Sequence, residues 1–191
     1  LAFALFSFSV NLLSAVLTLS ATLFYVFVYT KILKRSTHQN IVIGGAAGAI
    51  PPMVGWTAVS GHIGLPALYM FAIVFFWTPP HFWALALTLK DDYARANIPM
   101  LPVVVGIKDT KKTIFLYTIL VFALTLMFFA TGAVGWIYLG LAIPLSMGFV
   151  LYAWRLMRGS GVDNAKGTFI YSMVFLVFIF LAIIIDSLIT L

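Results

Sequence analysis

Two long stretches of this chain contain no lysine or arginine, and they separate three clusters of basic residues. Each stretch is mainly apolar and about twice as long as the ~20 residues that one membrane-spanning helix needs. Each therefore predicts a helical hairpin, which places all three clusters on the same side of a membrane. The clusters contain Lys31, Lys34 and Arg35; Lys90, Arg95, Lys108, Lys111 and Lys112; and Arg155, Arg158 and Lys166.

Composition supports this interpretation. Apolar residues make up 63% of the chain and charged residues only 8%, against about 25% charged in soluble domains. A soluble globular domain and a disordered chain are therefore excluded. The net charge of +6 does not indicate a nucleic-acid partner, because no basic stretch is free of the membrane. The positive-inside rule places the basic side in the cytoplasm, or in the matrix of a mitochondrion. The chain has no cysteine, so disulfides and thiol catalysis are excluded.

The fold class that we expect is an all-α, polytopic transmembrane bundle forming a single domain over residues 1–191. The first 33 residues as one helix would run about 50 Å, longer than the ~30 Å hydrocarbon core, so we expect a break near Asn11–Ser14. The connection 90–112 holds three of the five acidic residues and is predicted to be a long inner loop. Because the chain opens at Leu1 within an apolar run, we expect it to be a fragment. Helices are predicted near 1–10 (truncated), 13–33, 41–59, 66–89, 113–131, 136–157 and 167–190.

Two predicted helices carry a proline pair, Pro51-Pro52 and Pro79-Pro80. Proline removes a backbone donor, and irregular backbone in lipid survives only against protein or a wet cavity. We therefore expect an internal cavity flanked by these two helices. The glycines of the first helix fit either of two roles, a cavity wall or close helix packing, as in Gly44-x-x-x-Gly48.

Asp91 and Asp92 are predicted to end a span on the basic side, where acidic groups oppose the helix dipole. A local ion pair with Arg95 is one explanation. The other is a divalent-cation site, because Mg²⁺ commonly takes one or two carboxylates together with phosphate oxygens.

Lys34 and Arg35 end an earlier span on the same side. They could be basic anchors at the membrane interface, or they could clamp an anion such as phosphate. We group Asn40, which follows shortly after, with this candidate diphosphate site.

His81 lies deep in a predicted span, and an ionisable residue inside a membrane indicates a functional site. It could orient a substrate, transfer a proton or ligate a haem iron. The alternative is a neutral histidine that is hydrogen-bonded to a carbonyl freed by the proline kink. Trp77 shares its helix face, and its ring could stabilise a cation.

Two motif-rich segments resemble the protohaem IX farnesyltransferases (haem O synthases), which belong to the UbiA-type superfamily of intramembrane prenyltransferases. The resemblance covers nearly the whole chain. The first segment runs Tyr29-Thr30-x-x-x-Lys34-Arg35, then Asn40-x-x-Ile43-Gly44-Gly45-x-x-Gly48-Ala49-x-Pro51-Pro52-x-x-Gly55-Trp56. The second runs Trp77-Thr78-Pro79-Pro80-His81-Phe82-Trp83-Ala84, then Asp92-Tyr93-x-x-Ala96-x-Ile98-Pro99-Met100-Leu101-Pro102.

The resemblance implies that farnesyl diphosphate is ionised with the help of Mg²⁺ and that a vinyl group of haem B attacks the allylic cation. Water then adds to the resulting cation and completes the hydroxyethylfarnesyl group of haem O. It implies Asp92 as the first metal and diphosphate ligand and Asp91 as the second, with Lys34 and Arg35 on the diphosphate. His81 would then lie in the haem or prenyl pocket, and we place Trp77 and Tyr93 in the pocket as well.

The resemblance also implies nine helices and two aspartate-rich loops. About seven of the helices, and only the second loop, would then be present. Two alternatives remain open: a prenyltransferase acting on a quinone precursor or chlorophyllide, and a membrane transporter. The expected location is the bacterial inner membrane or, alternatively, the mitochondrial inner membrane. Proteins of a haem-using terminal oxidase pathway are possible partners.

Overall fold

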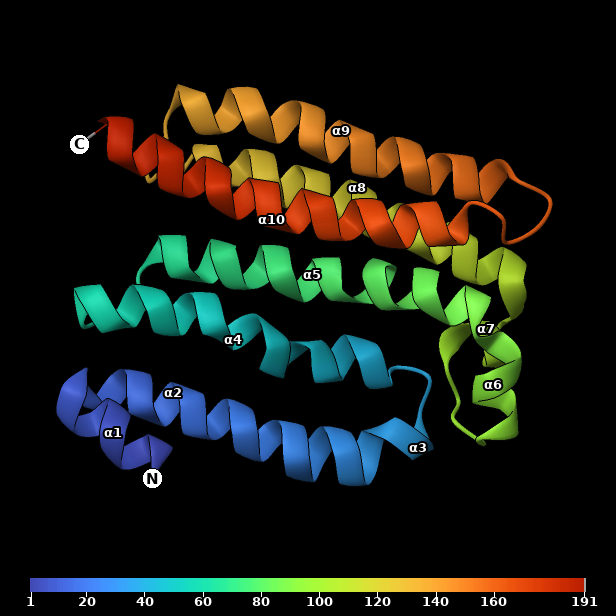
Figure 1. Cartoon of the computed structure of the whole chain (residues 1–191), viewed down its shortest axis with the longest axis horizontal. Coiled ribbons are helices and arrows are strands. Elements are labelled where there is room, and N and C mark those ends of the chain that lie inside the picture. The colour runs from blue at the N-terminus through green and yellow to red at the C-terminus, as the bar shows by residue number, and fades with distance from the viewer. Residues whose placement is uncertain (191) are drawn as a thin grey trace.

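The computed structural model describes residues 1–190, and every regular element in that part of the chain is helical (Figure 1). The predicted all-α fold is therefore confirmed. The elements are α1 (Ala2–Ser9), α2 (Leu12–Leu23), the π-helix η1 (Phe24–Leu33), α3 (Lys34–Ser36), α4 (Asn40–Ser60), α5 (Leu65–Thr88), α6 (Lys90–Arg95), α7 (Leu101–Val104), α8 (Gly106–Phe129), α9 (Trp136–Arg158) and α10 (Ala165–Thr190).

Six helices of the described residues are long and apolar enough to cross a membrane: Leu12–Ser36, α4, α5, α8, α9 and α10. The seventh predicted segment, near 1–10, is α1, which is too short to span. The predicted break near Asn11–Ser14 is confirmed, because Asn11 caps the start of α2. Its side chain accepts a hydrogen bond from the amide of Ser14 at 2.8 Å, which satisfies one of the free donors at a helix N-terminus.

The connection 90–112 differs from the predicted loop. It contains α6 and α7, and α8 begins at Gly106, seven residues before the predicted start at 113. Asn97 and Gly106 both have positive φ, which turns the chain between short helices. Pro102 lies in the first turn of α7, where its missing N–H costs nothing. The charged residues of this connection after Gly106 thus lie in a helix and not in a loop, and all of them except the buried Lys111 are exposed.

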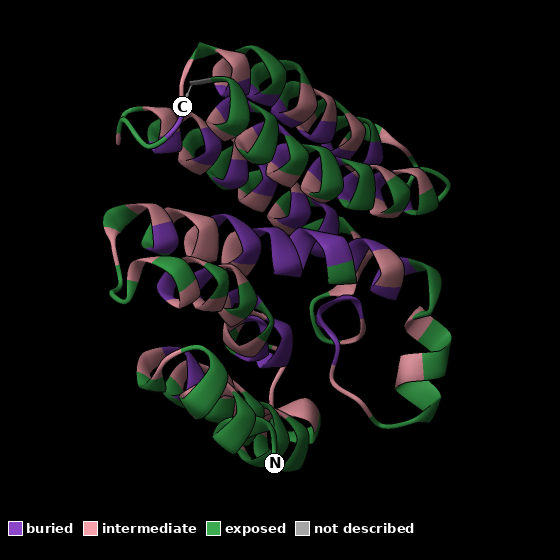
Figure 2. Ribbon diagram, turned by 60° about the vertical axis from the view of Figure 1, so that its left-hand side comes forward, coloured by how far each residue is buried: buried purple, intermediate pink, exposed green. Residues whose placement is uncertain are grey.

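The six spans lie side by side, and α5 is the most enclosed of them. It packs against α4, α8 and α10, and Figure 2 shows buried residues concentrated along its length. Pro79 and Pro80 are buried within it. The candidate site therefore has α5 as its central wall.

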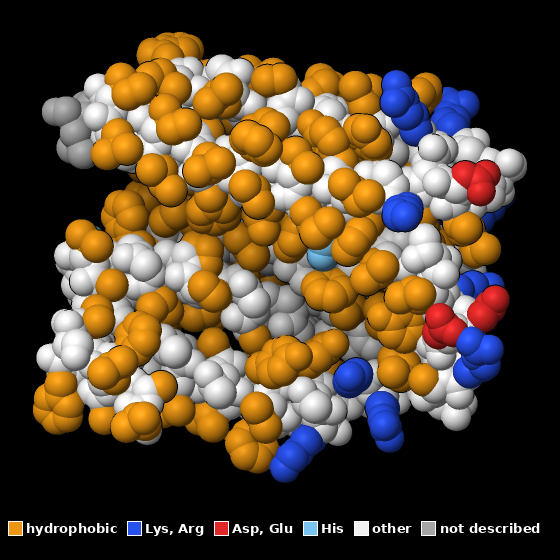
Figure 3. Space-filling view, in the orientation of Figure 1, with side chains coloured by type: hydrophobic (Ala, Val, Ile, Leu, Met, Phe, Trp, Pro, Cys, Tyr) orange, Lys and Arg blue, Asp and Glu red, His pale blue; other side chains and the backbone are white. Residues whose placement is uncertain are grey.

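Charged side chains gather at one end of the bundle (Figure 3). η1, α5 and α9 end there, and α4, α8 and α10 begin there (Figure 1). The predicted grouping of all three basic clusters on one side is therefore confirmed. At the opposite end, the connections 61–64 and 130–135 contain no lysine, arginine, aspartate or glutamate.

Candidate functional site

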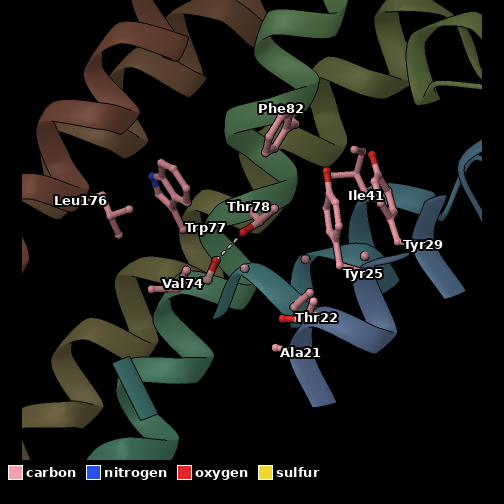
Figure 4. A pocket seen from close by; sticks show the side chains of 14 residues that line it. Ala21, Thr22, Tyr25, Tyr29, Ile41, Val74, Trp77, Thr78, Phe82 and Leu176 are labelled. Atoms are coloured by element: carbon pink, nitrogen blue, oxygen red, sulfur yellow. Dashed lines mark hydrogen bonds between the residues drawn. The ribbon is translucent and has the colours of Figure 1, made fainter. Parts of the chain in front are cut away.

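A cavity of about 580 Å³ lies between the α2–η1 helix, α4 and α5, and Leu176 of α10 completes its lining (Figure 4). Its walls are mainly apolar, as a site for a hydrocarbon chain requires. The lining residues are Ala21, Thr22, Tyr25, Tyr29, Ile41, Gly44, Gly45, Ala47, Gly48, Val74, Trp77, Thr78, Phe82 and Leu176.

The two roles considered for the glycines of α4 apply to different residues. A β-carbon on Gly44 would lie 2.3 Å from the ring of Tyr29, so this glycine permits close packing of η1 on α4. Gly48 lines the cavity, and a β-carbon on it would meet nothing within 4 Å. Gly48 therefore keeps open space in the cavity wall.

Tyr25 and Tyr29 project into the cavity from η1 (Figure 4), and their ring centroids are 5.2 Å apart. Neither tyrosine was among the site residues predicted from the sequence. Their spacing of four residues puts both rings on one helix face, and this spacing is the sequence pattern that could have indicated a shared position in the cavity wall. Thr78 and Phe82 of α5 were missed in the same way.

Trp77 lies in the cavity wall. Its indole Nε1–H donates to the carbonyl oxygen of Ser172 on α10 at 2.8 Å. This bond connects residues 95 positions apart, and it fixes the indole between α5 and α10.

His81 is buried behind this wall and does not itself line the cavity. Its ring stacks on Trp77 at 4.3 Å and on Phe169 at 4.7 Å between centroids. Its Nδ1 lies 2.7 Å from the hydroxyl oxygen of Ser172. The suggested partner, a carbonyl freed by the proline kink, is therefore wrong, because a serine hydroxyl of the last helix takes its place. His81 thus lies in the layer directly behind Trp77, and its place in the haem or prenyl pocket stays a prediction.

The predicted diphosphate residues lie at the charged end of the bundle. Lys34 is half-buried and Arg35 exposed, in the short helix α3. Asn40 is 1% exposed at the start of α4. Its Nδ2 donates to the carbonyl of Lys34 at 3.3 Å, while its buried Oδ1 has no hydrogen-bond partner among the described residues. The Nδ2 of Asn40 thus holds the α3–α4 connection in place, and its Oδ1 is still able to accept a hydrogen bond.

Asp91 and Asp92 are both exposed on α6. Arg95 forms an ion pair with Asp92 and not with Asp91, so the predicted local ion pair is confirmed for Asp92 and wrong for Asp91. Asp91 has no ion pair within residues 1–190. Three metal-ligating side chains do not come together anywhere in that part of the chain. The two carboxylates can therefore supply part of a Mg²⁺ site, with phosphate oxygens and water supplying the rest.

Tyr93 does not line this cavity, and its place in the substrate pocket stays a prediction. It packs on the cluster of Ile41, Ala86 and Met100, and Ile41 belongs to the cavity lining. Tyr93 thus connects the acidic helix α6 to the charged end of the cavity.

The prediction of an internal cavity flanked by the two proline-containing helices is confirmed, because residues of both α4 and α5 line the first cavity. The two proline pairs themselves lie beside different cavities. Pro79-Pro80 lies beside the first cavity, next to Thr78, whereas Pro52 lines a second one of about 600 Å³. The second cavity reaches Ser60 of α4 and Ser187 of α10, at the end of the bundle away from the charges. The two proline pairs lie beside different cavities because they lie at different depths along the antiparallel helices α4 and α5.

A family model described as the UbiA prenyltransferase family matches residues 1–184. The chain is 49% identical over 191 residues to a protein of Rippkaea orientalis named protoheme IX farnesyltransferase, covering 98% of this chain and 59% of that protein. Proteins of the same name from Synechocystis (50% over 190 residues, covering 98% of this chain and 60% of that protein) and Hahella chejuensis (48% over 183 residues, covering 96% and 61%) are also similar. The chain thus spans about three fifths of the length of these relatives. No solved structure matches it.

Proposed function

The chain belongs to the UbiA prenyltransferase family, and we propose that it takes part in transferring a farnesyl group from farnesyl diphosphate to a vinyl group of haem B, forming haem O. The observation that supports this most directly is the apolar cavity, whose lining reaches Tyr29 and Ile41 near the charged end of the bundle. Farnesyl diphosphate has the same division into an apolar chain and a charged head. The printed name of the similar proteins supplies the two substrates.

The diphosphate is proposed to bind at the charged end. Arg35 offers a two-pronged donor and Lys34 a compact positive charge for phosphate oxygens. The unpartnered Oδ1 of Asn40 accepts a hydrogen bond, so it would hold a water or an ammonium group rather than the diphosphate itself. Asn40 therefore acts here by holding the carbonyl of Lys34 in place.

Asp91 and Asp92 are proposed to hold Mg²⁺ together with the diphosphate. The fit rests on exposed carboxylates, of which Asp91 has no ion pair and Asp92 has only an exposed and therefore weak one. The metal would supply positive charge that neutralises the leaving diphosphate. The two carboxylates contribute fixed negative charge at the charged end, outside the apolar cavity.

The farnesyl chain is proposed to lie in the cavity. Tyr25, Tyr29 and Trp77 present aromatic rings there, and such rings attract a cation. The apolar lining excludes water from an allylic cation, which would otherwise be quenched. Trp77 is the wall residue best fixed for this role, because its indole is hydrogen-bonded to α10.

A prenyltransferase for a quinone precursor or chlorophyllide would use the same cavity and charged end. The proposal that haem B accepts the farnesyl group is therefore supported by the names of the relatives alone. A transporter would need polar groups near mid-membrane. Among the described residues, the acidic and basic side chains crowd one end instead, with Asp186 near the other. This distribution favours the prenyltransferase.

The six spans make this a multi-pass membrane protein. We propose that it resides in the bacterial inner membrane with its basic end in the cytoplasm, the mitochondrial inner membrane being the alternative. Its product would be used by proteins of a haem-dependent terminal oxidase pathway.

The test is haem O formation from haem B, farnesyl diphosphate and Mg²⁺ in membranes, followed by chromatography and mass spectrometry. One sample contains residues 1–191 alone, and the other contains them fused to the part of the Synechocystis relative that they do not cover. We expect haem O only from the fusion, because the resemblance implies a further aspartate-rich loop. A fusion that inserts stably but makes a prenylated quinone precursor and no haem O would exclude the proposal.

A further inference from the structure

Ser172 of α10 receives hydrogen bonds from two side chains of α5. Its carbonyl oxygen accepts from the indole N–H of Trp77 at 2.8 Å, and its hydroxyl oxygen lies 2.7 Å from Nδ1 of His81. All three residues are buried, and Ser172 is fully so. One residue of the last helix therefore sets the position of both aromatic rings beside the cavity.

The protons of this network can be assigned from its acceptors. The hydroxyl of Ser172 donates its only proton to the carbonyl of Phe169 at 2.5 Å, because a carbonyl oxygen can only accept. The hydroxyl oxygen must then accept from Nδ1–H of His81. In a neutral imidazole one nitrogen donates and the other accepts, so Nε2 carries the lone pair.

The ring stack transmits this restraint to the cavity. His81 lies between Phe169 and Trp77, and Trp77 forms part of the cavity lining. If the hydrogen bond between His81 and Ser172 is lost, the imidazole of His81 can rotate. The ring surface on which the indole of Trp77 stacks then changes. The indole is the group that we place beside the allylic cation.

We propose that Ser172 is a positioning residue for the transfer reaction, which fixes His81 in the Nδ1–H tautomer and, through it and through its own carbonyl, holds Trp77 against the cavity. This inference rests on the proposed function for its effect on rate. The tautomer of His81 does not depend on that function.

The tautomer is tested by ¹⁵N-histidine NMR of residues 1–191 in lipid nanodiscs. The chain has three histidines, and the His81 signals are identified as those that disappear in His81→Phe. We expect an Nδ1–H tautomer in the parent protein and a mixture of tautomers in Ser172→Ala. Ser146→Ala is the matched control, since Ser146 is equally buried and its hydroxyl has no hydrogen-bond partner among the described residues. An Nε2–H tautomer in the parent protein, or no change in Ser172→Ala, would overturn the proposal.

The effect on the reaction is tested in the fusion protein. We expect Ser172→Ala to lower kcat about tenfold, the effect of one lost hydrogen bond at most, with KM for farnesyl diphosphate unchanged because the diphosphate binds elsewhere. Ser146→Ala should retain the parent kcat.

His81→Phe keeps a flat ring in the stack but removes both nitrogens. In that background, Ser172→Ala should cause no further loss, as expected for two residues that act as one unit. Losses that multiply would overturn the proposal. A parent fusion that makes no haem O would instead contradict the proposed function, and the tautomer measurement would still decide the inference about His81.

Discussion

Lys111 and Asp186 hold opposite ends of the same helix, α9, although neither belongs to it. The ammonium group of Lys111, from α8, donates to the carbonyls of Gly159 and Gly161 at 2.6 and 2.8 Å, just beyond the C-terminus of α9. The carboxylate of Asp186, from α10, accepts from the amides of Gly135 and Tyr138 at 2.5 and 3.0 Å, at its N-terminus. Both charges are buried and have the sign that the helix dipole favours at that end.

Asp186→Ala should destabilise the protein without altering the cavity. Two amides at the start of α9 would lose their acceptor, at a cost of about 2–4 kcal/mol. Thermal unfolding in detergent, followed by tryptophan fluorescence, measures the effect. Asp163→Ala is the control, because Asp163 lies exposed in the α9–α10 connection. Equal melting temperatures for the two variants would contradict a capping role for Asp186.

Lys111→Met should also lower stability, by about 1–3 kcal/mol, because it removes two hydrogen bonds from a charged donor. Methionine retains most of the length of the side chain, so packing changes little. Lys112→Met serves as the comparison, because Lys112 is exposed and forms only a long ion pair with Asp109, at 3.7 Å. Such an exposed pair contributes little to stability. The prediction fails if the neighbouring variant is the less stable of the two in the same unfolding experiment.

Gly44→Ala should be costly, whereas Gly48→Ala should be tolerated. The new methyl group at residue 44 would displace the ring of Tyr29, at about 1–3 kcal/mol for overpacking. At residue 48 the same methyl group meets open space. Melting temperatures of the two variants provide the test, and a reversed order would show that η1 does not pack on α4 as described.

Asp92→Asn should lower haem O formation by the fusion protein about 10²–10³-fold, the usual effect of removing one electrostatic group from a reaction site. Asp91→Asn should cost less, and both variants should require more Mg²⁺. Asp109→Asn is the control, because Asp109 is an exposed aspartate near the start of α8, which begins at the same end of the bundle. Activity is measured against Mg²⁺ concentration. Parent-like curves for both α6 variants would place the metal elsewhere.

Cysteines at His62 and Lys112 should react with a membrane-impermeant thiol reagent from opposite sides of the membrane. Both positions are exposed, at opposite ends of the bundle, and the chain has no cysteine of its own. Lys111 is unsuitable because it is only 4% exposed. Labelling of intact cells and of inverted vesicles gives the comparison, and modification of both sites from one side would refute the topology.

The spans and the charged end could be predicted because both are local properties of the sequence. Runs of apolar residues define the helices, and the basic clusters define one end. The start of α8 was missed because Lys108, Lys111 and Lys112 were interpreted as loop, whereas Lys111 is buried against the α9–α10 connection. The sequence alone does not show whether the ammonium group of a lysine donates hydrogen bonds to a carbonyl that is distant in the chain.

The interior of the site could be predicted only in part. Helices that are apolar on all sides do not show which face is buried, so nothing in the sequence separates Trp77, in the cavity wall, from His81, behind it. The partner of His81 lies 91 residues away on α10. Such a pairing depends on how the helices pack and leaves no local pattern.

The contribution of α10 also bears on the order in which the protein can mature in the membrane. Because Ser172 and Leu176 come from the last helix, α5 enters the bilayer long before its partner is synthesised. During that interval Trp77 and His81 have no α10 to bind, and contacts this distant in sequence form late. A chain that ended before α10 would therefore insert α4 and α5 without the hydrogen bonds that connect Trp77 and His81 to Ser172.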